Sequence, residues 1–379
     1  MPLIDPQPSG NSLTSGKLTV LHTEWSDGWG GQERRILSEM IGMRKRGYRQ
    51  LLACRSSCKI GTEAKSAGIS TFHQPFAGKF DVASIRNLIR LIHDEGVDLV
   101  NTHSGIDSWV GGIAARLAGV LLVRTRHLNL PLKRNLLNFV HYLPHAVVTC
   151  GEEMRRILIN RGFPPNEVHS IPTGIDFGAF KPKIQRADMR MTLKLQPDTF
   201  TVIMVGIIRG VKRHEIALRA FAELHREHPN SSLLLAGEGP MRVDMERLAA
   251  ELQLGENIHF LGQRNDVPDL LQAADCLLLT SRSEGVPQAV TQAMGCGLPV
   301  VATAVGGVPE LVRDGETGLL VPPESVELTA LALQRLADNS KLARELALSG
   351  QQHAERLYSI DAMLGATESL YRQLQVDTR

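Results

Sequence analysis

The stretch that decides the fold is residues 275–311, which read DCLLLTSRSEGVPQAVTQAMGCGLPVVATAVGGVPEL. Two short apolar runs, 276–279 and 299–302, have the length and composition of strands that are buried on both faces. A helix between them is expected to start after Glu284, because apolar residues then recur at helical spacing. A parallel strand, helix and strand would place residues 281–288 at the carboxyl edge of a sheet, where open α/β folds bind ligands.

A second helix start follows at once. Gly306 and Gly307 predict a tight turn, and Pro309 suits the first helical position. Two helix amino ends near one crevice would attract a phosphate group.

The rest of the chain continues the same alternation of strands and helices. Strands are predicted at residues 17–22, 50–54, 97–102, 120–125, 146–150, 168–171, 200–205, 232–236, 258–261 and 318–321. Helices are predicted at 33–46, 85–93, 152–161, 215–225, 242–252 and 267–273, with more helix from 325 onward. This is an α/β pattern of two doubly wound domains, and the proline-containing, charged segment 182–198 looks like the linker.

Composition fits a globular enzyme with two domains. The chain has 379 residues, of which 43% are hydrophobic, and no apolar run is long enough to span a membrane. The first 16 residues predict a flexible leader and not a secretion signal. Five scattered cysteines indicate free thiols in a reducing cytoplasm.

The residues quoted so far resemble a known donor-site signature. Retaining GT-B glycosyltransferases of family 4 carry Glu, seven residues, Glu, then a small-residue turn and Pro-Val-Val. Here Glu284 fills the first place, Gln292 stands in the second, and the turns 296–301 and 306–310 follow. The resemblance covers nearly all of the chain. It implies two Rossmann-like domains that face each other across a cleft. The acceptor-side domain would comprise 17–182, and the donor-binding domain would comprise 183–359. The last helix, at 360–379, would cross back to join the acceptor-side domain.

The resemblance also implies a set of site residues. His127, Glu284, Arg209 and Lys212 are the expected catalytic residues, and His103 and Arg126 are expected on the acceptor side. The expected donor-binding residues are Gly30, Gly31, Gly206, Arg209, Lys212, Gly237, Gly262, Gln263, Arg264, Glu284, Gly285, Val286, Pro287, Gln288 and Gln292.

The chemistry of these residues suits a diphosphate sugar, although each has a plainer alternative. A guanidinium fork at Arg209 and a compact ammonium at Lys212 match phosphate oxygens, but they could form a solvated basic loop. Glu284 could accept hydrogen bonds from sugar hydroxyls or could cap a helix. An amide at Gln292 still offers an acceptor and two donors, without charge. His127 ends a strand and could be structural.

The resulting hypothesis is a hexosyltransferase that needs no metal and no cofactor. It would move a sugar from a nucleotide-diphosphate donor, UDP in preference to GDP, to a glycan or lipid-linked acceptor with retention, as in lipopolysaccharide or exopolysaccharide synthesis. Two alternatives stay open: a nucleotide-sugar 2-epimerase and a non-catalytic sugar-nucleotide binder. The absence of Asp-x-Asp, of Gly-x-Gly-x-x-Gly after the first strand, of a phosphate loop and of Gly-x-Ser-x-Gly argues against other enzyme classes.

Charge distribution suggests where the enzyme works. The first 180 residues hold 21 Lys and Arg against 15 Asp and Glu, an excess that could face an anionic membrane or be ordinary solvated charge. Segment 129–143 mixes basic with apolar residues and could lie on a membrane surface or form a buried amphipathic helix. We expect a cytoplasmic protein, peripheral on the inner membrane face, with no nucleic-acid partner.

Overall fold

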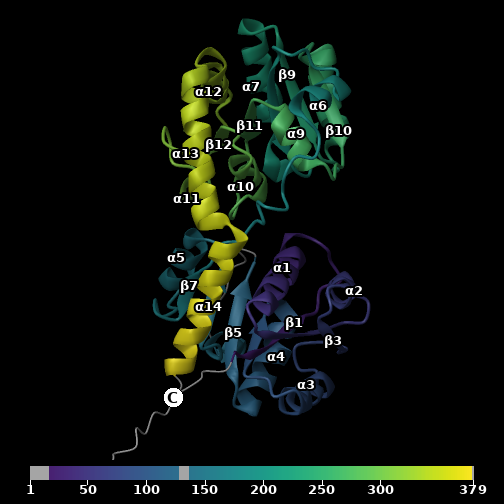
Figure 1. The fold of residues 1–379 in the computed structure, drawn as a ribbon, viewed down its shortest axis with the longest axis vertical. Coiled ribbons are helices and arrows are strands. Elements are labelled where there is room, and N and C mark those ends of the chain that lie inside the picture. Colours follow the sequence, from purple (N-terminus) through teal and green to yellow (C-terminus); the bar gives the residue numbers. More distant parts are fainter. Residues whose placement is uncertain (1–16, 128–135, 378–379) are drawn as a thin grey trace, which may run out of the picture. The chain divides into compact units, whose positions relative to one another are not determined.

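The computed structural model describes residues 17–127 and 136–377 and contains two parallel sheets with helices around them (Figure 1). Its compact units do not follow chain order. Unit 1 comprises the described residues up to 28 together with 40–122, and unit 2 comprises 29–39 together with the described residues from 123 onward. The expected domain boundary at 182 and 183 stays a prediction, and the expected leader at 1–16 lies outside the described residues.

The first sheet has seven strands in the order β3-β2-β1-β4-β5-β6-β7. These strands are β1 (Thr19–Glu24), β2 (Arg49–Cys54), β3 (Ser70–His73), β4 (Leu99–Thr102), β5 (Leu121–Arg126), β6 (Ala146–Thr149) and β7 (Val168–Ser170). The helices are α1 (Gly31–Lys45), α2 (Lys59–Ser66), α3 (Val82–Asp94), α4 (Gly105–Ala118), α5 (Glu152–Asn160) and the short η1 (Leu136–Tyr142). Strand β1 pairs in parallel with both β2 and β4, so the strand order reverses at β1.

The second sheet has six strands in the order β10-β9-β8-β11-β12-β13. These strands are β8 (Phe200–Val205), β9 (Ser231–Ala236), β10 (Ile258–Gly262), β11 (Cys276–Leu279), β12 (Val300–Thr303) and β13 (Leu319–Val321). The helices are α6 (Arg186–Thr192), α7 (His214–Glu227), α8 (Arg242–Glu251), α9 (Val267–Ala273), α10 (Gln288–Gly295), α11 (Val308–Leu311), α12 (Val326–Asp338), α13 (Ser340–Tyr358) and α14 (Ile360–Asp377), with short turns η2 (Gly210–Lys212) and η3 (Gly255–Asn257). The doubly wound order predicted from the sequence is therefore confirmed in both sheets.

The deciding stretch folds largely as predicted. Strands β11 and β12 are buried throughout, and they pair in parallel with Leu278 opposite Val301. The helix between them starts later than expected, at Gln288, with Pro287 as its N-cap residue. The prediction that the helix starts directly after Glu284 is wrong, because Val286 precedes a proline and such a residue is sterically driven away from helical geometry.

The turn at Gly306 and Gly307 makes close backbone contact with the loop that carries Glu284 and Gly285. Gly306 has a φ of +54°, and a Cβ atom there would lie 1.9 Å from the carbonyl oxygen of Glu284. A Cβ atom on Gly307 would lie 2.4 Å from the carbonyl oxygen of Gly285. Only residues without a side chain permit this approach, so the two glycines fix the loop that carries Glu284.

The family resemblance implied that the last helix joins the residues of 17–182, and α14 contacts two parts of that range (Figure 1). The backbone of Ile175 accepts a hydrogen bond from Ile360 N (2.9 Å) and donates one to Tyr358 O (2.8 Å). Further along the helix, the Tyr371 hydroxyl lies 3.5 Å from Glu39 Oε1 on α1.

The segment expected to be the linker, 182–198, contains a helix, α6. Two arginines of α6 anchor it to the start of β11, since Arg186 pairs with Asp275 at 2.6 Å and Arg190 donates to the carbonyl of Ala273 at 2.8 Å. Among the described helices, none combines the length and apolar character that a membrane crossing requires. Residues 129–135 of the expected membrane-surface segment 129–143 lie outside the described residues, and η1 occupies most of the remainder.

Candidate functional site

The order of the second sheet reverses between β8 and β11, and this is where doubly wound folds bind ligands. The loops after these two strands meet through an ion pair in which Lys212 Nζ lies 2.6 Å from Glu284 Oε1. Both side chains are largely buried, and the Ser281 hydroxyl donates a second hydrogen bond to the same carboxylate. Two residues that the sequence predicted for the donor site are thus brought together, and each neutralises the other.

Arg209 is placed differently from Lys212. It is exposed and precedes the short turn η2, and within the described residues its side chain has no hydrogen bond or ion pair. It lines neither of the two cavities described below. Its expected contact with phosphate therefore stays a prediction.

A cavity of about 1050 Å³ opens at the carboxyl ends of β8, β9 and β10. Its wall includes these predicted donor residues: Gly30, Gly31, Gly206, Gly237, Gln263, Arg264, Gln288 and Gln292. The glycines allow adjacent turns to touch, because a Cβ atom on Gly237 would lie 1.9 Å from the carbonyl oxygen of Gly206. Arg264 donates to Asp266 at 2.8 Å (Nε to Oδ1), which fixes the turn after β10. A cavity of this volume lies at the upper end of the range for small-molecule sites.

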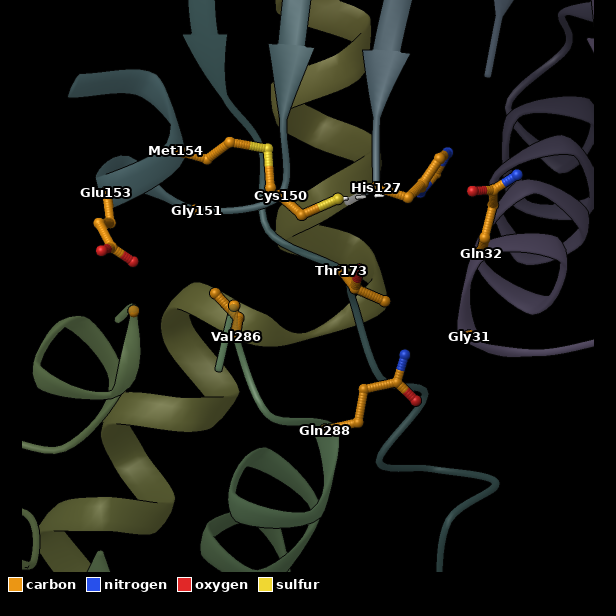
Figure 2. A pocket seen from close by; sticks show the side chains of 12 residues that line it. Gly31, Gln32, His127, Cys150, Gly151, Glu153, Met154, Thr173, Val286 and Gln288 are labelled. Atoms are coloured by element: carbon orange, nitrogen blue, oxygen red, sulfur yellow. Dashed lines mark hydrogen bonds between the residues drawn. The ribbon is translucent and has the colours of Figure 1, made fainter. Parts of the chain in front are cut away.

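A smaller cavity of about 250 Å³ shares Gly31 and Gln288 with the larger one. Figure 2 shows His127 and Cys150 on one side of it and Val286 and Gln288 on another. The remaining wall residues are Gln32, Gly151, Glu153, Met154, Thr173, Gly285 and Gly307. Because the two cavities adjoin, a ligand in the larger one could extend a terminal group toward His127.

Burial and nearby positive charges keep the imidazole in the smaller cavity neutral. Burial, and then the charges of Arg35 and Arg126, hold the pKa of His127 well below its ordinary value. The Cys150 thiol donates to the carbonyl of Arg126 at 3.1 Å, and its sulfur lies 3.8 Å from His127 Nδ1. At neutral pH His127 therefore offers hydrogen bonds without positive charge.

Glu153 is the carboxylate in the wall of this smaller cavity. Burial and the nearby carboxylate of Glu310 raise its pKa. Glu310 accepts hydrogen bonds from the backbone amides of Glu152, at 2.7 Å, and of Glu153, so it caps the start of α5.

The other predicted residues occupy supporting positions. Pro287 caps α10, and Gly262 has a φ of +68° at the end of β10, without lining either cavity. Arg126 is buried in β5, where burial first and then Arg124 and Arg161 lower its pKa to about 9. His103 belongs to unit 1, where its Nε2 lies 2.9 Å from His22 Nδ1.

The site residues expected from the sequence did not include seven that line the smaller cavity: Gln32, Cys150, Gly151, Glu153, Met154, Thr173 and Gly307. A usable signal was present, because Cys150 ends a predicted buried strand and residues 151–154 directly follow it, so they must reach the carboxyl edge of a parallel sheet. Their chemistry gave no such signal, since a thiol, a thioether and a first-turn carboxylate are all common in structural roles.

Within the described residues, no group of three or more His, Cys, Asp and Glu side chains has a geometry that could hold a metal ion. All five cysteines are free thiols, of which Cys54, Cys58 and Cys276 are buried.

Comparisons with known proteins agree with the two-sheet architecture. Residues 29–178 match the family described as Glycosyltransferase Family 4, and residues 185–353 match Glycosyl transferases group 1. The chain belongs to glycosyltransferase family 4 and has the GT-B architecture.

Similar proteins extend over most of the chain. A D-inositol 3-phosphate glycosyltransferase of Rhodococcus opacus is 28% identical, with 99% of this chain and 93% of the relative covered. An Escherichia coli UDP-Gal:alpha-D-GlcNAc-diphosphoundecaprenol alpha-1,3-galactosyltransferase is 27% identical, with 87% and 90% covered. Among solved structures, Anabaena Alr3699/HepE in complex with UDP has a TM-score of 0.84 at 21% identity, with 94% and 100% covered, which shows a shared fold.

Proposed function

We propose that this glycosyltransferase moves a hexosyl group from a nucleotide-diphosphate sugar to an acceptor hydroxyl with retention of configuration. The observation that carries the proposal is the Lys212–Glu284 pair at the switch point. Lys212 Nζ lies 3.9 Å from where a Cβ of Gly206 would be, and Gly206 lines the larger cavity. Phosphate oxygens at this edge would meet the ammonium, and sugar hydroxyls would meet the carboxylate.

The proposed transfer begins when Lys212 and Glu284 exchange their contact with each other for contacts with the donor. When the donor binds, Lys212 releases Glu284 and contacts the departing diphosphate, where Arg209 can add its charge. Fixed positive groups then stabilise the negative charge that develops as the glycosidic bond breaks. Glu284, freed from the lysine, orients the sugar hydroxyls, and His127 contacts the sugar from another side. The acceptor hydroxyl attacks on the face that the leaving group vacates, so no protein carboxylate is assigned as a nucleophile.

We favour a UDP-sugar donor and a glycan or lipid-linked acceptor. The support is the name of the Escherichia coli relative, which specifies UDP-Gal and a diphosphoundecaprenol-linked acceptor. Such an acceptor would place the enzyme on the cytoplasmic face of a membrane, in lipopolysaccharide or exopolysaccharide synthesis. Gln292 in the larger cavity would bind the ribose hydroxyls through an uncharged amide.

The first test is a thermal-shift screen of UDP, GDP and their sugars, followed by transfer assays with the compounds that bind. A UDP-sugar should raise the melting temperature, because a ligand that binds only the folded state stabilises it. Transfer should continue in EDTA, because lysine and arginine supply the charge that a metal would otherwise supply. If UDP-sugars give neither stabilisation nor transfer, the proposal fails.

Two controls separate the proposal from its alternatives. Product analysis without acceptor would reveal a 2-epimerase, which would convert the donor sugar on its own. Comparing wild type with Gln292→Glu tests for a non-catalytic binder: tight donor binding without transfer or hydrolysis in both proteins would favour that alternative.

A further inference from the structure

A fully buried arginine lies behind the wall of the smaller cavity. Arg35 on α1 donates from Nη1 to the sulfur of Cys150, at 2.9 Å, and lies 3.4 Å from the Thr173 hydroxyl. Its side chain is about 1% exposed. Cys150 and Thr173 both line the cavity that contains His127 (Figure 2). One guanidinium thus contacts two separate parts of the cavity wall.

This arginine is costly to bury, and its charge is only partly compensated. The nearest carboxylate, Glu39, lies one helical turn away, with 4.0 Å between Oε2 and Arg35 Nε. Within the described residues, Nε and Nη2 of Arg35 are buried and have no hydrogen-bond partner. An apolar residue would avoid the desolvation cost of a buried ion pair. Packing alone therefore does not explain why a positive charge is buried at this position.

The positive charge of Arg35 acts on the imidazole of His127. Burial lowers the pKa of this imidazole most, and among the described residues the charges of Arg35 from α1 and Arg126 from β5 lower it further. The Cys150 thiol lies beside its Nδ1 atom. An imidazolium in contact with the sugar would oppose the positive charge that develops on the anomeric carbon during transfer. A cation held behind the cavity wall opposes that charge less, because Coulomb energy falls with distance.

We propose that Arg35 is a positioning residue of the transfer site, which holds Cys150 and Thr173 in the cavity wall and places a positive charge behind Cys150, the neighbour of His127. This inference rests on the proposed function and adds a residue that the family signature does not contain. Arg35 acts through its neighbours, because its own guanidinium does not line the cavity.

The test compares three variants of the full chain: Arg35→Gln, Glu39→Gln and the double variant Arg35→Gln/Glu39→Gln. Each breaks the same buried ion pair, but only two of them remove the positive charge. The double variant also avoids leaving Glu39 buried without a partner, which could unfold the single Arg35 variant. The readout is the pH titration of His127 by NMR on histidine-labelled protein, with the signal assigned from a His127→Gln sample.

The two variants without Arg35 should titrate His127 at higher pH than wild type does, because a nearby cation disfavours protonation. Glu39→Gln should not raise the midpoint. In transfer assays, the acid-side fall of kcat/KM should occur at a higher pH in the double variant than in wild type, because His127 would become protonated at a higher pH. Arg35→Lys retains the charge but not the fork, so it should keep the wild-type titration.

A folded double variant with an unchanged His127 midpoint would overturn the inference, as would an equal upward change in Glu39→Gln. The NMR measurement needs no substrate. A failure of the proposed function, meaning no transfer by wild type with any nucleotide sugar, is therefore distinguishable from a failure of this inference.

Discussion

At the residue scale, the decisive feature is the ion pair of Lys212 with Glu284. The proposed ligand of the lysine is phosphate, and that of the glutamate is a sugar hydroxyl. Lys212 and Glu284 contact each other at 2.6 Å, so phosphate must compete with the carboxylate for the ammonium. Replacing Glu284 with Gln removes that competition, and UDP without a sugar should bind as tightly as to wild type or more tightly. Lys212→Ala should weaken UDP binding at least tenfold, because charge-assisted bonds to phosphate are lost. Isothermal titration calorimetry measures both affinities.

The matched control for Lys212 is Lys341→Ala, which removes an exposed lysine whose partner is Glu345 at 3.9 Å. Exposed pairs contribute little, so UDP affinity should not change. Weaker UDP binding by Glu284→Gln would contradict the proposed exchange of partners.

At the scale of secondary-structure elements, α5 depends on a residue far away in the sequence. Its N-cap residue, Gly151, has no side chain to accept the first amide hydrogens, and Glu310 accepts them instead. Glu310→Ala should reduce the free energy of unfolding by about 1 kcal/mol, the usual cost of a lost cap. Glu310→Gln should cost less, since an acceptor oxygen remains, and it should lower the pKa of Glu153 by removing a like charge. Urea denaturation measures the first effect, and an NMR carboxyl titration measures the second.

Glu316→Ala is the control for this prediction, because it removes an exposed glutamate whose partner, Arg313, lies 3.7 Å away. Equal destabilisation by Glu310→Ala and Glu316→Ala would show that the cap contributes nothing specific.

At the scale of the whole molecule, both cavities belong to unit 2. Binding of UDP should therefore slow amide hydrogen exchange in the loops at 206–213, 262–266 and 280–292, because a ligand lowers the population of open states. Exchange in 49–73 of unit 1 should not change. Mass spectrometry of peptides from the intact chain with and without UDP measures both. Protection confined to unit 1 would mean that the donor site is elsewhere.

The deciding stretch shows how much of the fold could be predicted. Strand β11 has the predicted bounds because a run of four apolar residues is buried wherever it lies in an α/β sheet. Helix α10 was misplaced at its start, since Pro287 outweighed the apolar spacing of Val286. Short elements such as α2, β3 and α6 were missed because their periodicity extends over too few residues to stand out.

The candidate site, like the fold, could be predicted from the sequence only in part. Sequence spacing could place Glu284 and Lys212 after strands, but only the strand order makes β8 and β11 neighbours, so that their loops meet. The contact between Arg35 and Cys150 joins residues 115 positions apart, and no local pattern predicts it.

By itself, the sequence determined the fold class, the family and the residue types available for the site, because burial patterns and turn chemistry act over a few neighbouring residues. Only the tertiary structure decided which of those residues share a cavity, which charges neutralise each other and which stay buried beside His127. Such contacts depend on distances between strands and helices that are remote in the chain, and Coulomb and hydrogen-bond energies follow those distances.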